Sequence, residues 1–183
     1  VVSRFVDQKG LDLLADALDE ILQNMRVQFV ILGSGEPVLE RYYGELPTRY
    51  PGRAGSYIGY NDQLAHWIEA GADFYIMPSR FEPCGLNQLY SMKYGTVPVV
   101  RATGGLMDTV TPVDKAKGTG TGFLFSEYSA AAFQKALDQA LEAYKDKKLW
   151  KTIMLNGMGE DFSWSASARA YLSLYERLVA GEI

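Results

Sequence analysis

The stretch FYIMPSRFEPCGLNQLYSMKYGTVPVV, residues 74–100, contains the structural unit that decides the fold. Its first four and last four residues are short apolar runs typical of buried strands, and residues 86–94 between them are expected to form a helix. Two neighbouring strands that are joined through a helix run parallel, and helices then cover both faces of their sheet. This stretch therefore predicts an α/β fold.

The same alternation of strands and helices continues toward both ends of the chain. Further strands are expected at residues 1–2, 28–32, 56–58 and 122–125. Further helices are expected at residues 11–25, after Pro37 (a short one), and at residues 61–70, 129–144, 147–156 and 164–180. We therefore expect one domain, residues 1–183, built on a doubly wound, mostly parallel sheet.

The composition excludes several classes of protein. The chain has 183 residues, 48% of them hydrophobic, which is enough to bury the core of one domain. The net charge of −4 argues against nucleic acid as a general partner. No apolar run approaches the ~20 residues that a membrane span needs. No signal peptide is visible, and because the sequence opens inside an expected strand, we expect further residues to precede it.

The single cysteine and the single histidine limit the chemistry. Cys84 has no second cysteine to pair with, which excludes an internal disulfide and fits a reducing compartment. It also lacks a basic partner in the sequence, so we expect a small buried thiol rather than a nucleophile. His66 lies within an expected helix and is expected to be structural. We therefore expect no metal site, because a histidine-based cluster needs more than one histidine.

Two loops at the carboxyl ends of neighbouring strands are candidates for ligand binding, because ligands bind at this edge of a parallel sheet. Glu82 follows one strand, beside Pro83, and its carboxylate can accept hydrogen bonds from sugar hydroxyls. The alternative is an acid in the first turn of a helix that complements the helix dipole. Thr103, Gly104 and Gly105 follow the next strand, where glycines let the backbone approach a ligand or form a plain turn. Both loops together favour one ligand site.

Arg4 and Lys9 lie in the loop that follows the first expected strand. Lys9 stands next to the start of a helix, where the helix dipole disfavours a cation. A phosphate that is bound by both Lys9 and the helix start would explain this position. The alternative is a pair of solvated surface charges.

Several segments resemble the C-terminal half of the bacterial glycogen synthases and plant starch synthases, which are retaining glycosyltransferases with two facing Rossmann-like domains (the GT-B architecture). The segments are SRFVDQKGLDLL (residues 3–14), IGYND (58–62), PSRFEPCGLNQLYSMKYGTVPVV (78–100), TGGLMDTV (103–110) and DFSWSASARAYLSLY (161–175). They cover nearly the whole chain, and PSRFEPCGL is highly specific. The resemblance implies transfer of glucose from ADP-glucose to the non-reducing end of an α-1,4-glucan with retention.

The resemblance also implies roles for individual side chains. Arg4 and Lys9 would neutralise the diphosphate of the donor and, with Glu82, would serve catalysis. Tyr60 would stack against the adenine ring. Glu82 would contact the hydroxyl groups of the transferred glucose.

Backbone groups complete the implied donor site. Amides around Cys84, Gly85 and Leu86 would help to hold sugar and phosphate, and residues 103–105 would cradle the phosphates. No cofactor is implied beyond the substrate ADP-glucose and the product ADP. The implied partners are the glucan and an N-terminal domain absent from this chain. The implied location is the bacterial cytoplasm, or the plastid stroma for a plant protein.

Two alternatives to this assignment remain open. Related retaining transferases carry a second glutamate eight positions after the first, where this chain has Tyr90. Tyr90 matches the starch-synthase branch and speaks against many other sugar-nucleotide transferases. The first alternative is the nucleotide-binding half of another retaining transferase, of the sucrose or trehalose type. The second is a free-standing module that binds a nucleotide or a glucan.

The final helix, residues 164–180, carries an apolar stripe at helical spacing. The stripe consists of Trp164, Ala168, Tyr171, Leu172, Tyr175, Leu178 and Val179. In the resembled family the end of the chain crosses back to the other domain, so we expect this face to be partly unpaired here. The alternative is a stripe that packs entirely on the domain's own sheet.

Overall fold

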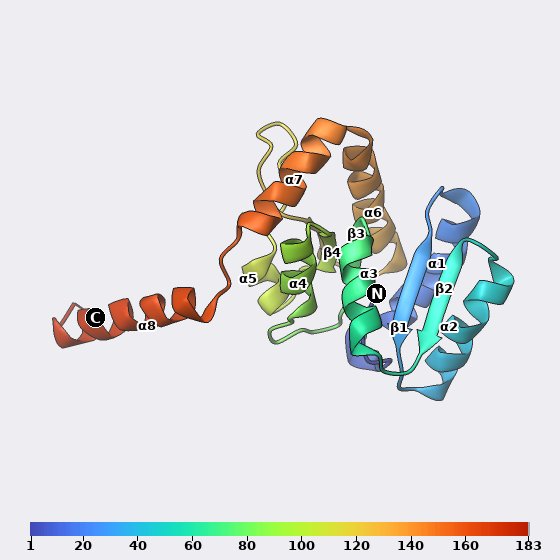
Figure 1. Cartoon of the computed structure of the whole chain (residues 1–183), viewed down its shortest axis with the longest axis horizontal. Coiled ribbons are helices and arrows are strands. Elements are labelled where there is room, and N and C mark those ends of the chain that lie inside the picture. Colours follow the sequence, from blue (N-terminus) through green and yellow to red (C-terminus); the bar gives the residue numbers. More distant parts are fainter. Residues whose placement is uncertain (183) are drawn as a thin grey trace.

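Parallel strands and covering helices build the computed structural model, which describes residues 1–182 (Figure 1). Strands β1 (Phe29–Gly33) and β2 (Ala54–Ile58) pair with each other. Strands β3 (Phe74–Met77), β4 (Val97–Arg101) and β5 (Phe123–Phe125) pair in that order, and all of these pairings are parallel. The predicted parallel α/β fold is confirmed.

The residues before Arg4 lie between the two parts of the sheet. Val2 forms a single parallel bridge with Leu32 of β1. On its other side, the Val2 N–H donates to the hydroxyl of Tyr75 on β3 at 3.0 Å, and that hydroxyl donates to the Val2 carbonyl at 2.8 Å. On this side the Tyr75 hydroxyl, rather than the backbone of β3, therefore pairs with the Val2 backbone. The sheet is therefore in two parts, with a cavity of about 620 Å³ between them that Phe29 and Phe74 help to line.

Helices cover both sides of the strands, as a doubly wound fold requires. They are η1 (Asp7–Lys9), α1 (Leu11–Asn24), α2 (Pro37–Arg49), α3 (Asp62–Gly71), α4 (Asn87–Tyr94), α5 (Gly105–Thr109), α6 (Ala130–Lys145), α7 (Lys147–Gly159) and α8 (Trp164–Val179). Helix α1 packs against α2 and α6, while α4 packs against α3 and α7 on the opposite side (Figure 1). Helix α2 is longer than the short helix expected after Pro37.

Local sequence signals explain where several helices begin and end. The Asn61 side chain accepts a hydrogen bond from the N–H of Leu64 at 2.9 Å and so caps α3, as expected from its position. Ser129 caps α6 in the same way. Gly95 adopts a left-handed conformation that ends α4. None of the helices in residues 1–182 is long and apolar enough to span a membrane.

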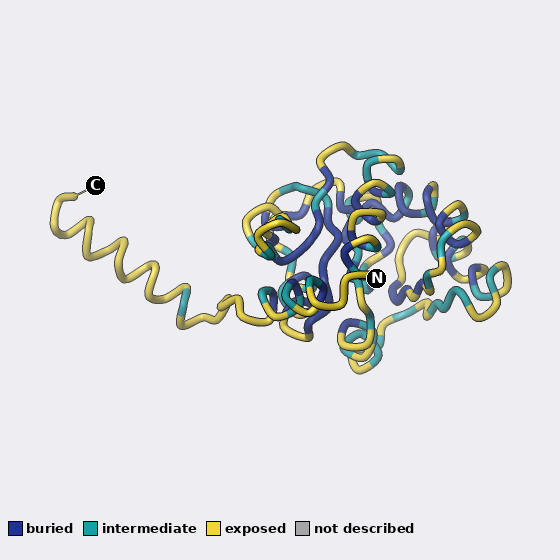
Figure 2. Tube along the Cα trace, turned by 90° about the horizontal axis from the view of Figure 1, so that it is seen from above, coloured by how far each residue is buried: buried dark blue, intermediate teal, exposed yellow. Residues whose placement is uncertain are grey.

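Helix α8 projects away from the rest of the protein, and it has no buried residue (Figures 1 and 2). Trp164 at its start is 91% exposed, and the large side chains of the predicted stripe are exposed along its length. The expected unpaired apolar face is therefore present. That it crosses to another domain stays a prediction.

Glu69 of α3 is an acid buried inside the fold, with 2% of its surface exposed. Burial raises the pKa of its carboxyl from 4.5 to about 7, an effect that nearby His66 only partly offsets. The folded state binds the proton of Glu69 more tightly than the unfolded chain does. Proton binding at Glu69 therefore adds to the free energy of unfolding in full below pH 4.5, and this contribution is lost as the pH rises through 7.

Glu69→Gln is therefore expected to have a higher melting temperature than the wild type at pH 8. At pH 4.5 the two proteins should have nearly the same melting temperature. Thermal unfolding of both proteins, followed by circular dichroism across this pH range, measures the effect. A difference in melting temperature that stays constant with pH would contradict the raised pKa of Glu69.

Candidate functional site

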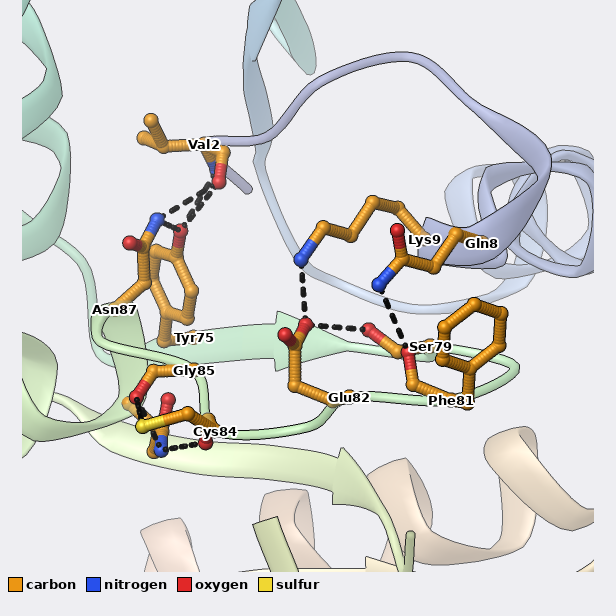
Figure 3. A network of polar contacts seen from close by, with 11 residues as sticks. Val2, Gln8, Lys9, Tyr75, Ser79, Phe81, Glu82, Cys84, Gly85 and Asn87 are labelled. Carbon is orange, nitrogen blue, oxygen red and sulfur yellow. Dashed lines mark hydrogen bonds and ion pairs between the residues drawn. The ribbon is translucent and has the colours of Figure 1, made fainter. Parts of the chain in front are cut away.

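The loop before α1 is joined to the loop after β3 by backbone and side-chain contacts (Figure 3). The N–H of Arg80 donates to the carbonyl of Gln8 at 2.9 Å, and the Gln8 amide donates to the carbonyl of Phe81 at 3.4 Å. Arg80 also forms ion pairs with Asp7 and Asp12. These contacts fix the position of Arg4 and Lys9 relative to the Glu82 loop.

Lys9 and Glu82 form an ion pair at the centre of this contact. The distance between Lys9 Nζ and Glu82 Oε2 is 2.5 Å, and Ser79 Oγ lies 3.4 Å from the same oxygen (Figure 3). Glu82 is only 5% exposed, so the charge of Lys9 compensates a buried carboxylate. Helix α4 begins five residues later, at Asn87, and has no acid in its first turn. The alternative that Glu82 is a first-turn acid of that helix is therefore wrong.

Glycines allow the loops to touch at two further points. Gly104 has φ +46°, and a Cβ there would overlap the carbonyl oxygen of Glu82. A Cβ on Gly105 would overlap the carbonyl of Cys84, and the Gly105 N–H donates to the Glu82 carbonyl at 2.9 Å. The Gly-Gly pair therefore has a structural reason in addition to any ligand contact: it brings the Thr103 loop against the Glu82 loop.

Gly104→Ala is accordingly expected to destabilise the fold by about 3 kcal/mol, from unfavourable backbone geometry together with the clash. Gly52→Ala is the matched control, because Gly52 also has a positive φ of 70° but no atom within 4 Å of a Cβ. Urea unfolding of both variants measures the difference. Equal losses of unfolding free energy would show that the contact between the two loops adds nothing.

A pocket of about 210 Å³ opens where these loops meet, and it collects several of the predicted residues. Arg4, Lys9, Gly85 and Leu86 line it, together with Asn87 at the start of α4. Arg4 is exposed and makes no ion pair within residues 1–182. Two cations and the positive end of a helix favour an anionic ligand.

Other predicted residues lie outside the pocket. Tyr60 is 84% exposed in the loop between β2 and α3. Residues 103–105 contact the Glu82 loop but do not line the pocket. Cys84 is exposed, which corrects the expectation of a buried thiol. Its carbonyl accepts a hydrogen bond from the Gln88 amide at 3.1 Å, and its Sγ lies 3.5 Å from the Gly85 carbonyl oxygen.

Two polar residues in this region, Asn87 and Gln88, could not be singled out from the sequence. Asn87 donates to the Val2 carbonyl at 2.9 Å and to the Tyr75 hydroxyl at 2.7 Å, which ties the start of α4 to the segment that carries Arg4 (Figure 3). Gln88 is completely buried. The pair Asn87-Gln88, polar and directly after Gly85-Leu86, was the available signal. Within residues 1–182 no group of three or more His, Cys, Asp or Glu side chains is placed to hold a metal ion.

Comparison with known proteins identifies close relatives. Residues 1–153 match the family described as glycosyl transferases group 1. A glycogen synthase from Thioalkalivibrio sulfidiphilus is 52% identical over 98% of this chain, and one from Anaeromyxobacter sp. (strain Fw109-5) is 50% identical over 98%. This chain spans 38% of the length of each of these relatives.

Solved structures agree with this relationship. The catalytic domain of starch synthase IV from Arabidopsis thaliana, bound to ADP and acarbose, has a TM-score of 0.85 and 36% identity. The alignment covers 98% of this chain and 38% of that structure. A sucrose-phosphate synthase from Thermosynechococcus elongatus has a TM-score of 0.70 and 26% identity, covering 98% of this chain and 45% of that one. The resemblance to the C-terminal domain of the glycogen and starch synthases is confirmed, and the chain belongs to the glycosyl transferases group 1.

Proposed function

We propose that this chain is the donor-binding half of an enzyme that transfers glucose from ADP-glucose to the non-reducing end of an α-1,4-glucan, with retention. The observation that carries the proposal is the pocket where Arg4, Lys9 and the start of α4 meet beside the carboxylate of Glu82. Cations and a helix start suit a diphosphate, and an adjacent carboxylate suits sugar hydroxyls. Relatives at about half identity that are named glycogen synthases support the same substrate class.

In this proposal Arg4 and Lys9 bind the diphosphate, and the amides near Cys84, Gly85 and Leu86 assist them. Glu82 contacts the glucosyl hydroxyls. The exposed ring of Tyr60 stacks on the adenine.

The loop of residues 103–105 cradles the phosphates from the side of β4. Two of its N–H groups, those of Thr103 and Gly104, make no hydrogen bond within residues 1–182 and are therefore available to a ligand. The third, that of Gly105, is already used by the Glu82 carbonyl.

These groups act on the charge that the reaction creates. Breaking the bond between the anomeric carbon and the diphosphate oxygen places negative charge on the leaving group and positive charge on the sugar. Arg4 and Lys9 stabilise that negative charge more strongly as it grows, so they lower the barrier as well as bind the donor. The ion pair with Glu82 holds Lys9 in place before the donor arrives, so little reorganisation is needed.

The exposed apolar face of α8 supports a second domain in the complete enzyme. We assign this helix to a contact with an N-terminal domain, which would also supply the glucan site and close over the donor. None of the residues assigned above binds the glucan acceptor. A location in the bacterial cytoplasm, or in the plastid stroma of a plant, goes with this assignment.

Calorimetric titration of the chain with ADP and with UDP tests the proposal. We expect ADP to bind with a dissociation constant of about 0.1–10 mM, because half of the contacts are missing, and UDP to bind more weakly. Arg4→Ala should weaken ADP binding at low salt, and the difference from the wild type should shrink at high salt, because salt screens the charge of Arg4. Preference for UDP would favour the sucrose- or trehalose-type alternative instead.

A further inference from the structure

The Gln88 side chain connects the two loops that meet at the pocket. Its Nε2 atom lies 3.1 Å from the carbonyl oxygens of Cys84 and Gly85 and 3.1 Å from Thr109 Oγ1 on α5. The Thr109 hydroxyl in turn donates to the Gly105 carbonyl at 2.6 Å. One buried amide thus fastens the loop before α4 to the helix that follows residues 103–105.

Holding these two carbonyls inward fixes the direction of two N–H groups. The carbonyl of Cys84 and the N–H of Gly85 belong to one peptide unit, and the carbonyl of Gly85 and the N–H of Leu86 belong to the next. In a trans peptide the C=O and N–H bonds point in opposite directions, and both units are trans. When the carbonyls point to Gln88, the N–H groups of Gly85 and Leu86 must point away from it.

The side of these peptides that faces away from Gln88 is the side that faces the pocket. Gly85 and Leu86 line it together with Arg4 and Lys9, whereas Gln88 does not, and the N–H groups of Gly85 and Leu86 make no hydrogen bond within residues 1–182. The loop also follows the outline of the Gln88 side chain closely, since a Cβ on Gly85 would come 2.5 Å from Gln88 Oε1. The amide therefore determines how this turn is shaped.

The Oε1 atom of Gln88 lowers the contribution of this residue to stability. It is buried and has no hydrogen-bond partner within the described part of the chain. A buried acceptor without a partner is unfavourable and calls for an explanation. The donors on Nε2 provide one, because an apolar side chain of the same size would fill the space but leave the Cys84 carbonyl without this donor and the Gly85 carbonyl with only the weak contact of Cys84 Sγ at 3.5 Å.

We propose that Gln88 is a positioning residue that aims the N–H groups of Gly85 and Leu86 at the diphosphate of the donor. The inference rests on the proposed function, because it assumes a diphosphate in the pocket. Gln88 itself touches no substrate. It acts through the two peptide units. Through Thr109 it also holds the loop of residues 103–105 in a fixed position relative to them.

Nuclear magnetic resonance of the ¹⁵N-labelled chain, titrated with inorganic pyrophosphate, tests the wild type. The amide resonances of Gly85 and Leu86 are expected to shift as pyrophosphate or ADP is added and to stay unchanged with adenosine. Binding that moves the resonances around Arg4 and Lys9 but leaves these two amides unchanged would overturn the role of Gln88. No binding of either probe would overturn the proposed donor site, and this inference with it.

Gln88→Met is the matched variant, since methionine has a similar length and lacks the donors. Pyrophosphate and ADP are expected to bind about tenfold more weakly to it, with the shifts of Gly85 and Leu86 lost. Gln134→Met on α6, where the amide contacts only Glu20 at 3.4 Å, should bind both probes as the wild type does.

The variant also separates positioning from a purely structural role. A structural role would lower the unfolding midpoint of Gln88→Met and leave the affinity and the amide shifts of its folded form as they are in the wild type. That result would overturn the inference about Gln88 and leave the proposed donor site intact. If Gln88→Met does not fold, the wild-type titration alone decides.

Discussion

Replacing Lys9 by methionine is expected to slow glucosyl transfer by roughly 100- to 1000-fold, the usual cost of removing one preorganised group that stabilises transition-state charge. The measurement uses this chain joined to the N-terminal part of a related glycogen synthase, with labelled glucose from ADP-glucose counted in glycogen. Lys9 is expected to contribute this much because it is held in place by Glu82 and lines the pocket with Arg4. Binding of ADP should weaken as well, because the same charge contacts the diphosphate.

Lys9→Met also leaves Glu82 buried without its partner, which must be separated from the effect on catalysis. Removing one member of a buried ion pair costs about 3 kcal/mol of unfolding free energy. The double variant Lys9→Met/Glu82→Gln carries neither charge and should recover most of that stability while ADP binding stays weak. If the double variant regained the ADP affinity of the wild type, Lys9 would act only through the fold.

Glu82→Gln alone completes this set of variants. Its carboxylate is assigned to the sugar, so turnover should fall while the affinity for ADP changes little. Loss of ADP binding by a folded Glu82→Gln protein would contradict that assignment.

The order of strands and helices could be predicted because it depends on local pattern. Apolar runs marked the strands from β1 to β5, and capping residues such as Asn61 marked helix starts. The split of the sheet could not be predicted in this way. It depends on the side chain of Tyr75, which bonds to the backbone of Val2, 73 residues away in the sequence.

The candidate site was predicted as a set of loops, but the contacts between those loops were not. Lys9 and Glu82 were assigned to different parts of the donor, and nothing in either segment indicated that they pair with each other. The Gly-Gly pair was recognised as a place of close approach, yet the neighbour it accommodates is the Glu82 loop of the protein itself. Such contacts follow from how two turns pack, which a one-dimensional pattern does not encode.

The isolated 183-residue chain is expected to transfer no glucose to glycogen at any concentration of ADP-glucose, although it should bind ADP. The residues assigned above all belong to the donor side, around a pocket of about 210 Å³. Glycosyl transfer requires that both substrates be positioned and that water be excluded, which one half of a cleft does not achieve. The exposed face of α8, with Trp164 91% exposed, is consistent with a domain that is missing from the chain.

Labelled glucose incorporation, measured side by side for the chain alone and for the chain joined to the N-terminal part of a related glycogen synthase, checks this expectation. Activity should appear only in the joined protein, and Lys9→Met should abolish most of it. The joined protein could also fold and bind ADP but stay inactive. That result would mean that the two domains do not form the contacts that transfer requires, and α8 would be the first segment to test. Robust incorporation by the chain alone would mean that its own loops position the glucan and exclude water, so that the acceptor site would have to be sought among residues 1–182.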